Sequence, residues 1–245
     1  MKILAIDTSL GSGSVAAADE GGGDEMPLGP AGEHARVLTK ALIEVASRRG
    51  WGEGSNPITG LGPDDVVAVV RGPGSFTGLR VGVTAAKAIA WTTGCHLVGV
   101  SGFEVIARRT GRLDGWMDTP VAIAYDAGRG EVFAAWAEPV TTDALGWRLA
   151  APRLIPFDDW LGSLPLGSHV SGPAVDAHRE RLVDHGGVVC ASREACLPFA
   201  LDTAAIAVLK ALAGEFDDPR TLVPDYLRPS YAEEARPGGS GSPTP

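Results

Sequence analysis

The sequence predicts an α/β protein built from two related domains that face one cleft. Each half contains an apolar strand that ends at an aspartate, Asp7 in the first half and Asp126 in the second. A turn rich in small residues follows each aspartate and leads into another strand, so the pattern resembles a duplication. The chain has 245 residues, of which 44% are hydrophobic, enough for one large or two ordinary domains.

The first predicted element is a hairpin formed by residues 2–6 and 14–18, with Asp7, Thr8 and Ser9 at its tip. Such a tip can hold phosphate through backbone amides while the carboxylate positions a metal or water. The alternative interpretation is an ordinary polar turn. A third strand is predicted near residues 25–28.

A helix is predicted over residues 33–49, because His34, Leu38, Ala41 and Val45 belong to one apolar stripe. A pair of metal ligands on this helix would require a second ligand four residues after the histidine, where the chain has leucine. We therefore interpret the histidine as a helix-end or interface residue. Residues 50–65 are rich in glycine, proline and polar residues and predict a loop.

The most specific stretch is residues 71–80, RGPGSFTGLR, which follows a β-branched strand at residues 66–70. Gly72 and Gly74 permit positive φ or a close backbone approach, and Ser75 can cap the helix that follows. That helix is predicted over residues 75–91.

Small residues recur at every fourth position of this helix, namely Gly78, Gly82, Ala86 and Ala90. Each glycine costs about 1 kcal/mol relative to alanine in a helix interior, so a close contact must offset that cost. The contact is either with the chain's own sheet or with another subunit, and the two can coexist on different faces. If the stripe is external, leucine at Gly78 or Gly82 is expected to disrupt pairing and leave the fold largely intact.

After the helix at residues 75–91, the sequence predicts a strand at residues 96–100, a helix capped by Ser101 that runs to about residue 109, and a hairpin of strands at residues 121–125 and 131–136. We predict a first subdomain over residues 1–105 plus about 200–230 and a second, smaller one over residues 106–199. Residues 232–245, mainly glycine, serine and proline, are predicted to form a disordered tail.

Composition narrows the classes of function. The net charge of −9 disfavours unaided binding of nucleic acid, whose affinity rests on lysine and arginine. No apolar stretch is long enough to span a bilayer, and the four apolar residues before Asp7 are too few for a signal peptide, so we expect a cytoplasmic protein. The three cysteines lack zinc-site spacing and are interpreted as structural thiols.

Several motifs together resemble the TsaB (YeaZ) family of tRNA threonylcarbamoyladenosine biosynthesis proteins. The resemblance spans residues 1 to about 230, and the stretch at residues 71–80 is its most specific part. The motifs that carry it are Ile6-Asp7-Thr8-Ser9, Ser14-Val15-Ala16, Glu33-His34, residues 71–80, residues 126–132 and Pro224-Asp225-Tyr226-Leu227-Arg228. This resemblance implies an actin/Hsp70-like (ASKHA) fold and a noncatalytic accessory role in tRNA processing.

The resemblance also implies partners. Similar proteins form a heterodimer through a helix bundle with TsaD, which transfers the threonylcarbamoyl group to the adenosine beside the tRNA anticodon, and TsaE joins as a third component. For the chain alone, a homodimer and a monomer stay open as alternatives. Contact with tRNA is expected only through the complex, and no membrane contact is expected. The implied interface is the helix pair at residues 34–49 and 75–91, and its predicted residues are His34, Leu38, Ala41, Val45, Gly78, Gly82, Ala86 and Ala90.

No catalytic residue, metal or cofactor is expected. A residual nucleotide contact would involve Asp7, Thr8, Ser9, Gly72, Gly74 and Ser75. Two enzymatic alternatives remain. A metal-dependent peptidase needs ligands, but the other four histidines show no metal-pair spacing, and an actin-fold small-molecule kinase would have to use Asp126 as its catalytic base.

Overall fold

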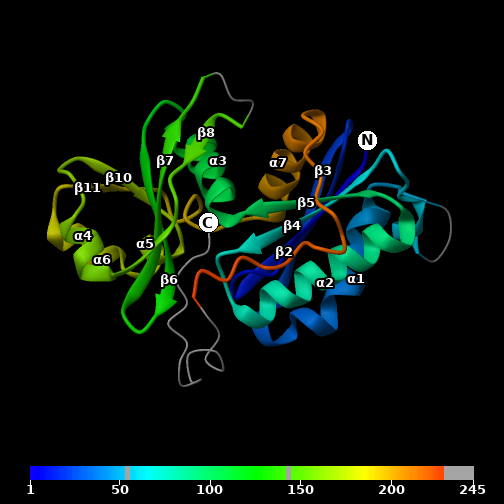
Figure 1. The fold of residues 1–245 in the computed structure, drawn as a ribbon, viewed down its shortest axis with the longest axis horizontal. Helices are drawn as coiled ribbons and strands as arrows, with labels where there is room; N and C mark the ends of the chain where they lie inside the picture. The colour runs from blue at the N-terminus through cyan, green and yellow to red at the C-terminus, as the bar shows by residue number, and fades with distance from the viewer. Residues whose placement is uncertain (53–55, 142–144, 229–245) are drawn as a thin grey trace.

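A computed structural model describes residues 1–52, 56–141 and 145–228 of the chain. It contains two β-sheets, each flanked by helices, which lie beside each other along the long axis of the molecule (Figure 1). The tail predicted at residues 232–245 lies outside the described residues.

The first sheet has five strands in the order β3-β2-β1-β4-β5. Its strands are β1 (Ile3–Asp7), β2 (Ser12–Asp19), β3 (Gly22–Pro30), β4 (Val66–Gly72) and β5 (His96–Ser101). Strand β2 pairs antiparallel with both β1 and β3, whereas β4 pairs parallel with both β1 and β5. Strand β1 is buried along its whole length, as expected for a central strand covered on both faces.

The second sheet repeats this order. Its strands are β6 (Val121–Gly128), β7 (Glu131–Pro139), β8 (Trp147–Leu149), β9 (Arg153–Pro156), β10 (Ser168–Ser171) and β11 (Val188–Cys190). Strands β6 and β7 form the antiparallel hairpin, as β1 and β2 do in the first sheet. Strand β10 pairs parallel with both β6 and β11. Two short strands, β8 and β9, pair with β7 on its other side, in the position that β3 has in the first sheet. The predicted duplicated α/β architecture is therefore confirmed.

Four long helices in the described part of the chain cover the first sheet or connect it to the second. Helices α1 (His34–Arg48) and α2 (Phe76–Thr93) lie side by side on one face of the first sheet (Figure 1). Helix α7 (Ala200–Leu212) covers the other face, although it follows the strands of the second sheet. Helix α3 (Gly102–Asp114) follows β5 and packs against the second sheet. The chain thus crosses between its halves in both directions.

Short helices complete the second half: α4 (Phe157–Gly162), α5 (Pro173–Ala177) and α6 (Arg179–His185). The predicted loop at residues 50–65 contains the 3-10 turn η2 (Pro57–Gly60), and the Asn56 side chain accepts a hydrogen bond from the Ile58 amide. The 3-10 turn η1 (Ala31–Glu33) precedes α1.

Local signals account for the starts and ends of the helices. The hydroxyl of Ser75 accepts a hydrogen bond from the Gly78 amide at 3.4 Å and caps α2, which ends at Gly94 with φ of 75°. Ser101 and Glu104 form a reciprocal capping box at the start of α3. These caps are at the positions that the sequence predicts.

A buried ion pair holds α3 against α7 and was not predicted. Nη1 of Arg109 lies 2.7 Å from Oδ2 of Asp202, and both side chains are less than a tenth exposed. The same guanidinium donates from Nε to the carbonyl oxygen of Glu194 at 2.8 Å and lies 4.1 Å from the ring centre of Phe199. This cluster fixes the place where the chain returns from the second sheet to the first.

No helix among the described residues is long and apolar enough to cross a membrane. The three cysteines are all free thiols, and Cys95 and Cys196 are buried. Burial raises the pKa of each thiol, so these side chains are poor nucleophiles.

Candidate functional site

The tip of the first hairpin is joined closely to the start of α2. The Thr8 hydroxyl donates to the carbonyl oxygen of Gly78 at 2.7 Å, and the Ser75 amide donates to the carbonyl oxygen of Ser9 at 2.7 Å. The amide and hydroxyl of Ser9 both donate to Oδ1 of Asp7, at 2.8 and 2.6 Å. The amides of Ser9 and Ser75 and the hydroxyls of Thr8 and Ser9 thus have partners within the chain, and a nucleotide would have to displace these contacts to bind them.

Three glycines make this close approach possible. A β-carbon added at Gly74, Gly78 or Gly82 would come closer than 3.0 Å to Ser9 or Thr8, which real β-carbons essentially never do. The missing side chains let α2 lie directly on the hairpin tip. The contact that offsets the two helical glycines is therefore internal to the chain.

This packing corrects the predicted interface residues. All eight predicted residues are buried within the chain itself, with their side chains or backbones on the inner faces of the two helices. The stripe of small residues is filled by the hairpin tip and strands β1 and β4, so it has no room for a helix from another protein. A protein–protein interface through α1 and α2 stays a prediction. It would have to use the outer faces of these helices, because their inner faces are buried within the chain.

His34 is the first residue of α1, and its side chain is buried. Its Nε2 lies 3.0 Å from the carbonyl oxygen of Gly29 and 3.3 Å from the amide of Gly13, so it links the hairpin to β3. No group of three or more potential metal ligands occurs in the part of the chain that the structure describes. Of the other histidines, His96 stacks on Phe216 with ring centres 3.7 Å apart.

Asp7 is an unusual buried acid, because its Oδ2 has no hydrogen-bond partner among the described residues. Burial raises the pKa of this carboxyl group, and the hydrogen bonds from Ser9 oppose the rise. An acid whose pKa is raised on folding destabilises the folded state above that pKa, and this penalty disappears as the pH falls toward the unfolded value.

We expect Asp7→Asn to stabilise the protein by about 1 kcal/mol at neutral pH, because asparagine keeps the acceptor for Ser9 and removes the buried charge. The gain should shrink as the pH is lowered, since the wild-type carboxyl group then takes up its proton. Urea denaturation at pH 7.5 and 5.0 measures both effects. A loss of stability at both pH values would contradict this account of Asp7.

The outer face of α2 is the most distinctive surface near this joint. Thr77, Thr84, Ala88 and Trp91 are exposed, and they recur with the spacing of one helix face. Trp91 is 71% exposed, a high value for so large an apolar side chain. These four residues are uncharged, and exposed Arg80 lies between Thr77 and Thr84 on the same side of the helix.

The two charged side chains of α2, Arg80 and Lys87, are both engaged with the C-terminal segment at residues 222–228, which we call the strap. Nζ of Lys87 donates to the carbonyl oxygen of Leu222 at 2.9 Å, and Nε of Arg80 donates to the Tyr226 hydroxyl at 2.9 Å. Arg80 also lies over the ring of Phe76 at 4.0 Å. The strap thus runs alongside α2 (Figure 1).

The strap also closes the turn at Gly72. The amide of Asp225 donates to the carbonyl oxygen of Arg71 at 2.8 Å, and the two side chains form an ion pair at 3.1 Å. Gly72 has φ of 151°, and an added β-carbon would lie 2.8 Å from the carbonyl oxygen of Asp225. The motif at residues 224–228 therefore serves the turn at residues 71–74, a relation that the sequence did not reveal.

The far end of the strap reaches the second hairpin. Arg228 donates to the carbonyl oxygen of Ala127 at 2.9 Å and forms an ion pair with Glu131. The second acidic tip itself is open, with Asp126 exposed and its Oδ1 accepting from the amide of Gly128 at 2.7 Å. The two tips therefore differ, because the first is packed under α2 and the second faces solvent.

Comparison with known proteins identifies the family. A family model described as TsaD, tRNA N6-adenosine threonylcarbamoyltransferase, matches residues 59–194. The tRNA threonylcarbamoyladenosine biosynthesis protein TsaB of Bacillus subtilis (strain 168) is 30% identical over 182 residues, which are 71% of this chain and 74% of that protein. The chain belongs to the TsaB family. TsaB of Escherichia coli (strain K12) is 34% identical over 139 residues, 56% of this chain and about half (54%) of that protein.

Solved structures agree with the TsaB assignment and with the actin/Hsp70-like fold. YeaZ from Pseudomonas aeruginosa has a TM-score of 0.72 at 24% identity, covering 91% of this chain and 100% of the other. A second structure, of an uncharacterized protein with similarity to peptidase YeaZ from Pseudomonas aeruginosa, has a TM-score of 0.74 at 25% identity, covering 93% and 99%. The resemblance found in the sequence is thus confirmed for the family and the fold.

Proposed function

We propose that this chain is a noncatalytic scaffold subunit in tRNA threonylcarbamoyladenosine biosynthesis, and that it pairs with and activates a TsaD-type transferase, with TsaE as a third component. The names of its TsaB relatives and the match to the TsaD family model support the pathway. The observation that carries the pairing is the exposed outer face of α2, formed by Thr77, Thr84, Ala88 and Trp91 beside Arg80, which the strap holds.

This face has the properties of a helix-docking surface. Small exposed residues such as Thr84 and Ala88 allow a partner helix to approach closely, and Trp91 offers a large apolar anchor at one end. Helix α1 lies alongside and adds exposed Ala35 and Thr39 to the surface. Two neighbouring helices with open outer faces can form a four-helix contact with an equivalent pair.

We expect Ala88→Glu to weaken binding of a TsaD protein from the same organism at least tenfold, because a charge would be buried in the contact. Ala88 is exposed, so the fold should be unaffected. Isothermal titration calorimetry with the purified full-length proteins measures the change. Val183→Glu, at a 66% exposed apolar position on α6, is the matched control and should bind normally.

A reconstitution tests the noncatalytic role. The chain alone should not modify tRNA, whereas omitting it from a mixture of TsaD, TsaE, threonylcarbamoyl adenylate and tRNA should sharply lower the yield of modified adenosine. Equal TsaD affinity of the Ala88→Glu variant would refute the docking face. Modification by the isolated chain, or metal-dependent cleavage of peptides by it, would refute the scaffold role and favour an enzymatic alternative.

A further inference from the structure

The second half contains a hollow that the proposed scaffold role does not use. It has a volume of about 170 Å³ and lies where the partner of β7 changes from β8 to β9. The pairing with β8 ends at Ala137 and the pairing with β9 begins at Ala134, so the chain between β8 and β9 leaves a gap beside the strand. Alanines at four lining positions keep the gap open: Ala134, Ala135, Ala150 and Ala151.

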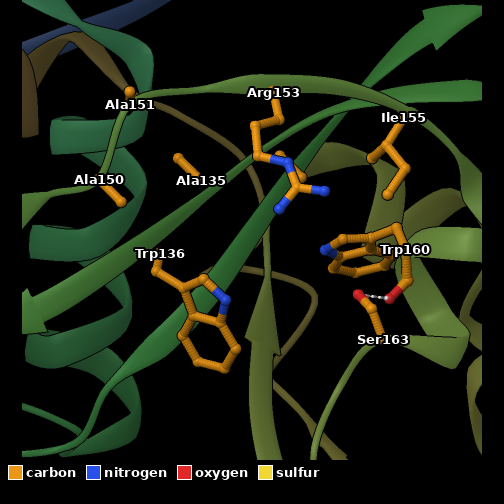
Figure 2. A pocket seen from close by; sticks show the side chains of 9 residues that line it. Ala135, Trp136, Ala150, Ala151, Arg153, Ile155, Trp160 and Ser163 are labelled. Atoms are coloured by element: carbon orange, nitrogen blue, oxygen red, sulfur yellow. Dashed lines mark hydrogen bonds between the residues drawn. The ribbon is translucent and has the colours of Figure 1, made fainter.

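Three nitrogen donors converge on this hollow, which we call the indole pocket. Figure 2 shows the indole nitrogens of Trp136 and Trp160 and the guanidinium group of Arg153 turned toward its interior. Within residues 1–52, 56–141 and 145–228, none of these three side chains has a hydrogen bond or ion pair. Ser163, also in the lining, already donates its hydroxyl proton to the carbonyl oxygen of Trp160 at 2.7 Å.

Trp160 is the most informative member of the set. Only 4% of this residue is exposed, because its ring packs into the core beside Phe157 at 5.7 Å between ring centres. Its indole N–H nevertheless lacks a partner in the described part of the chain, and it is not sealed off. A buried tryptophan usually satisfies this donor, so the open N–H marks a place for an acceptor atom from outside the chain.

The donor set defines the chemistry of the ligand. An indole N–H can only donate, and a guanidinium group carries donors and a positive charge but no acceptor. No aspartate or glutamate lines the pocket, so the charge of Arg153 is not neutralised there. Apart from Ser163, whose hydroxyl proton is already donated, the remaining surface consists of alanines, Ile155 and indole rings, which favour an apolar body.

We propose that the indole pocket binds a small organic acid, with the carboxylate held by Arg153 and the two indole N–H groups and the apolar body against the rings. The volume limits that body to about one ring, since an apolar cavity of about 150 Å³ accommodates benzene. The carboxylate supplies the acceptor atoms that all three donors lack.

Titration with benzoate at constant ionic strength tests the proposal, read from the indole N–H signals of the ¹⁵N-labelled full-length protein. We expect the signals of Trp136 and Trp160, assigned with Trp→Phe variants, to shift, while those of Trp51 and Trp91 stay in place. Arg153→Met should raise the dissociation constant about tenfold, the usual effect of losing one charge-assisted hydrogen bond. Benzamide, a neutral ligand of the same shape, should bind more weakly than benzoate.

The matched control is Arg148→Met, on β8 outside the pocket lining, where the arginine pairs with Glu138. This variant should bind benzoate like the wild-type protein. Both arginines are exposed, so neither change should disturb the fold, and the remaining indole signals report on that directly. Unmoved signals of Trp136 and Trp160 up to the solubility limit of benzoate, or equal affinity of the Arg153→Met variant, would overturn the proposal.

Discussion

Replacing Gly78 with leucine should destabilise the protein by at least about 3 kcal/mol, because the side chain would have to enter the space held by the backbone of Thr8. Backbone atoms of a buried strand end cannot move aside as a flexible side chain can. This result differs from the outcome expected for an external stripe, in which pairing is lost and the fold survives. Chemical denaturation followed by circular dichroism measures the change.

Smaller substitutions on the same helix sharpen this test. Gly78→Ala should also destabilise, although alanine is intrinsically favoured by about 1 kcal/mol in a helix, because the first added carbon already overlaps Thr8. Ala88→Leu, on the exposed face, should leave the stability within about 0.5 kcal/mol of wild type. If Gly78→Ala proved stabilising, the close contact between α2 and the hairpin tip would be wrong.

Replacing Arg109 with alanine should cost about 3 kcal/mol of folding stability. The change leaves the carboxylate of Asp202 buried with one partner fewer, and removing one member of a buried pair typically costs about 3–5 kcal/mol. The remaining partner, Arg112, is half exposed and cannot fully replace the lost charge. Urea denaturation gives the difference.

The matched control is Arg112→Ala, which removes the exposed partner of the same carboxylate and should cost no more than about 1 kcal/mol. A double-mutant cycle between Arg109 and Asp202 then gives their coupling free energy. Equal costs for the two arginine variants would show that burial does not set the strength of this cluster.

Much of the fold could be predicted because its signals are local. The strand before Asp7, the hairpin after it and the caps at Ser75 and Ser101 depend on residues adjacent in sequence. The antiparallel pair of β6 and β7, which flanks the turn after Asp126, is likewise predictable from residues adjacent in sequence. The short strands β8 to β11 and helices α4 to α6 were not predicted, since elements of three to seven residues carry too little periodicity.

The candidate site could be predicted only in part, because the tertiary structure decides which part of the chain, or which other protein, packs against a given helix face. A stripe of small residues shows that something approaches α2 closely, but Thr8 and a foreign helix produce the same pattern in the sequence. The strap contacts join residues about 100 to 150 positions apart, such as Arg80 and Tyr226. Trp136 and Trp160 likewise meet only after the sheet has formed.

The strap gives the molecule a third connection between its halves, in addition to α3 and the return through Arg109. A domain that is connected to its neighbour at one point can rotate about that point, whereas connections at three separate points oppose rotation about every axis. Any relative movement of the two halves must therefore shear the contacts that Arg228 and Asp225 make. Because the same strap is hydrogen-bonded to Arg80 and Lys87, a protein bound along α2 would lie next to a segment that contacts both halves.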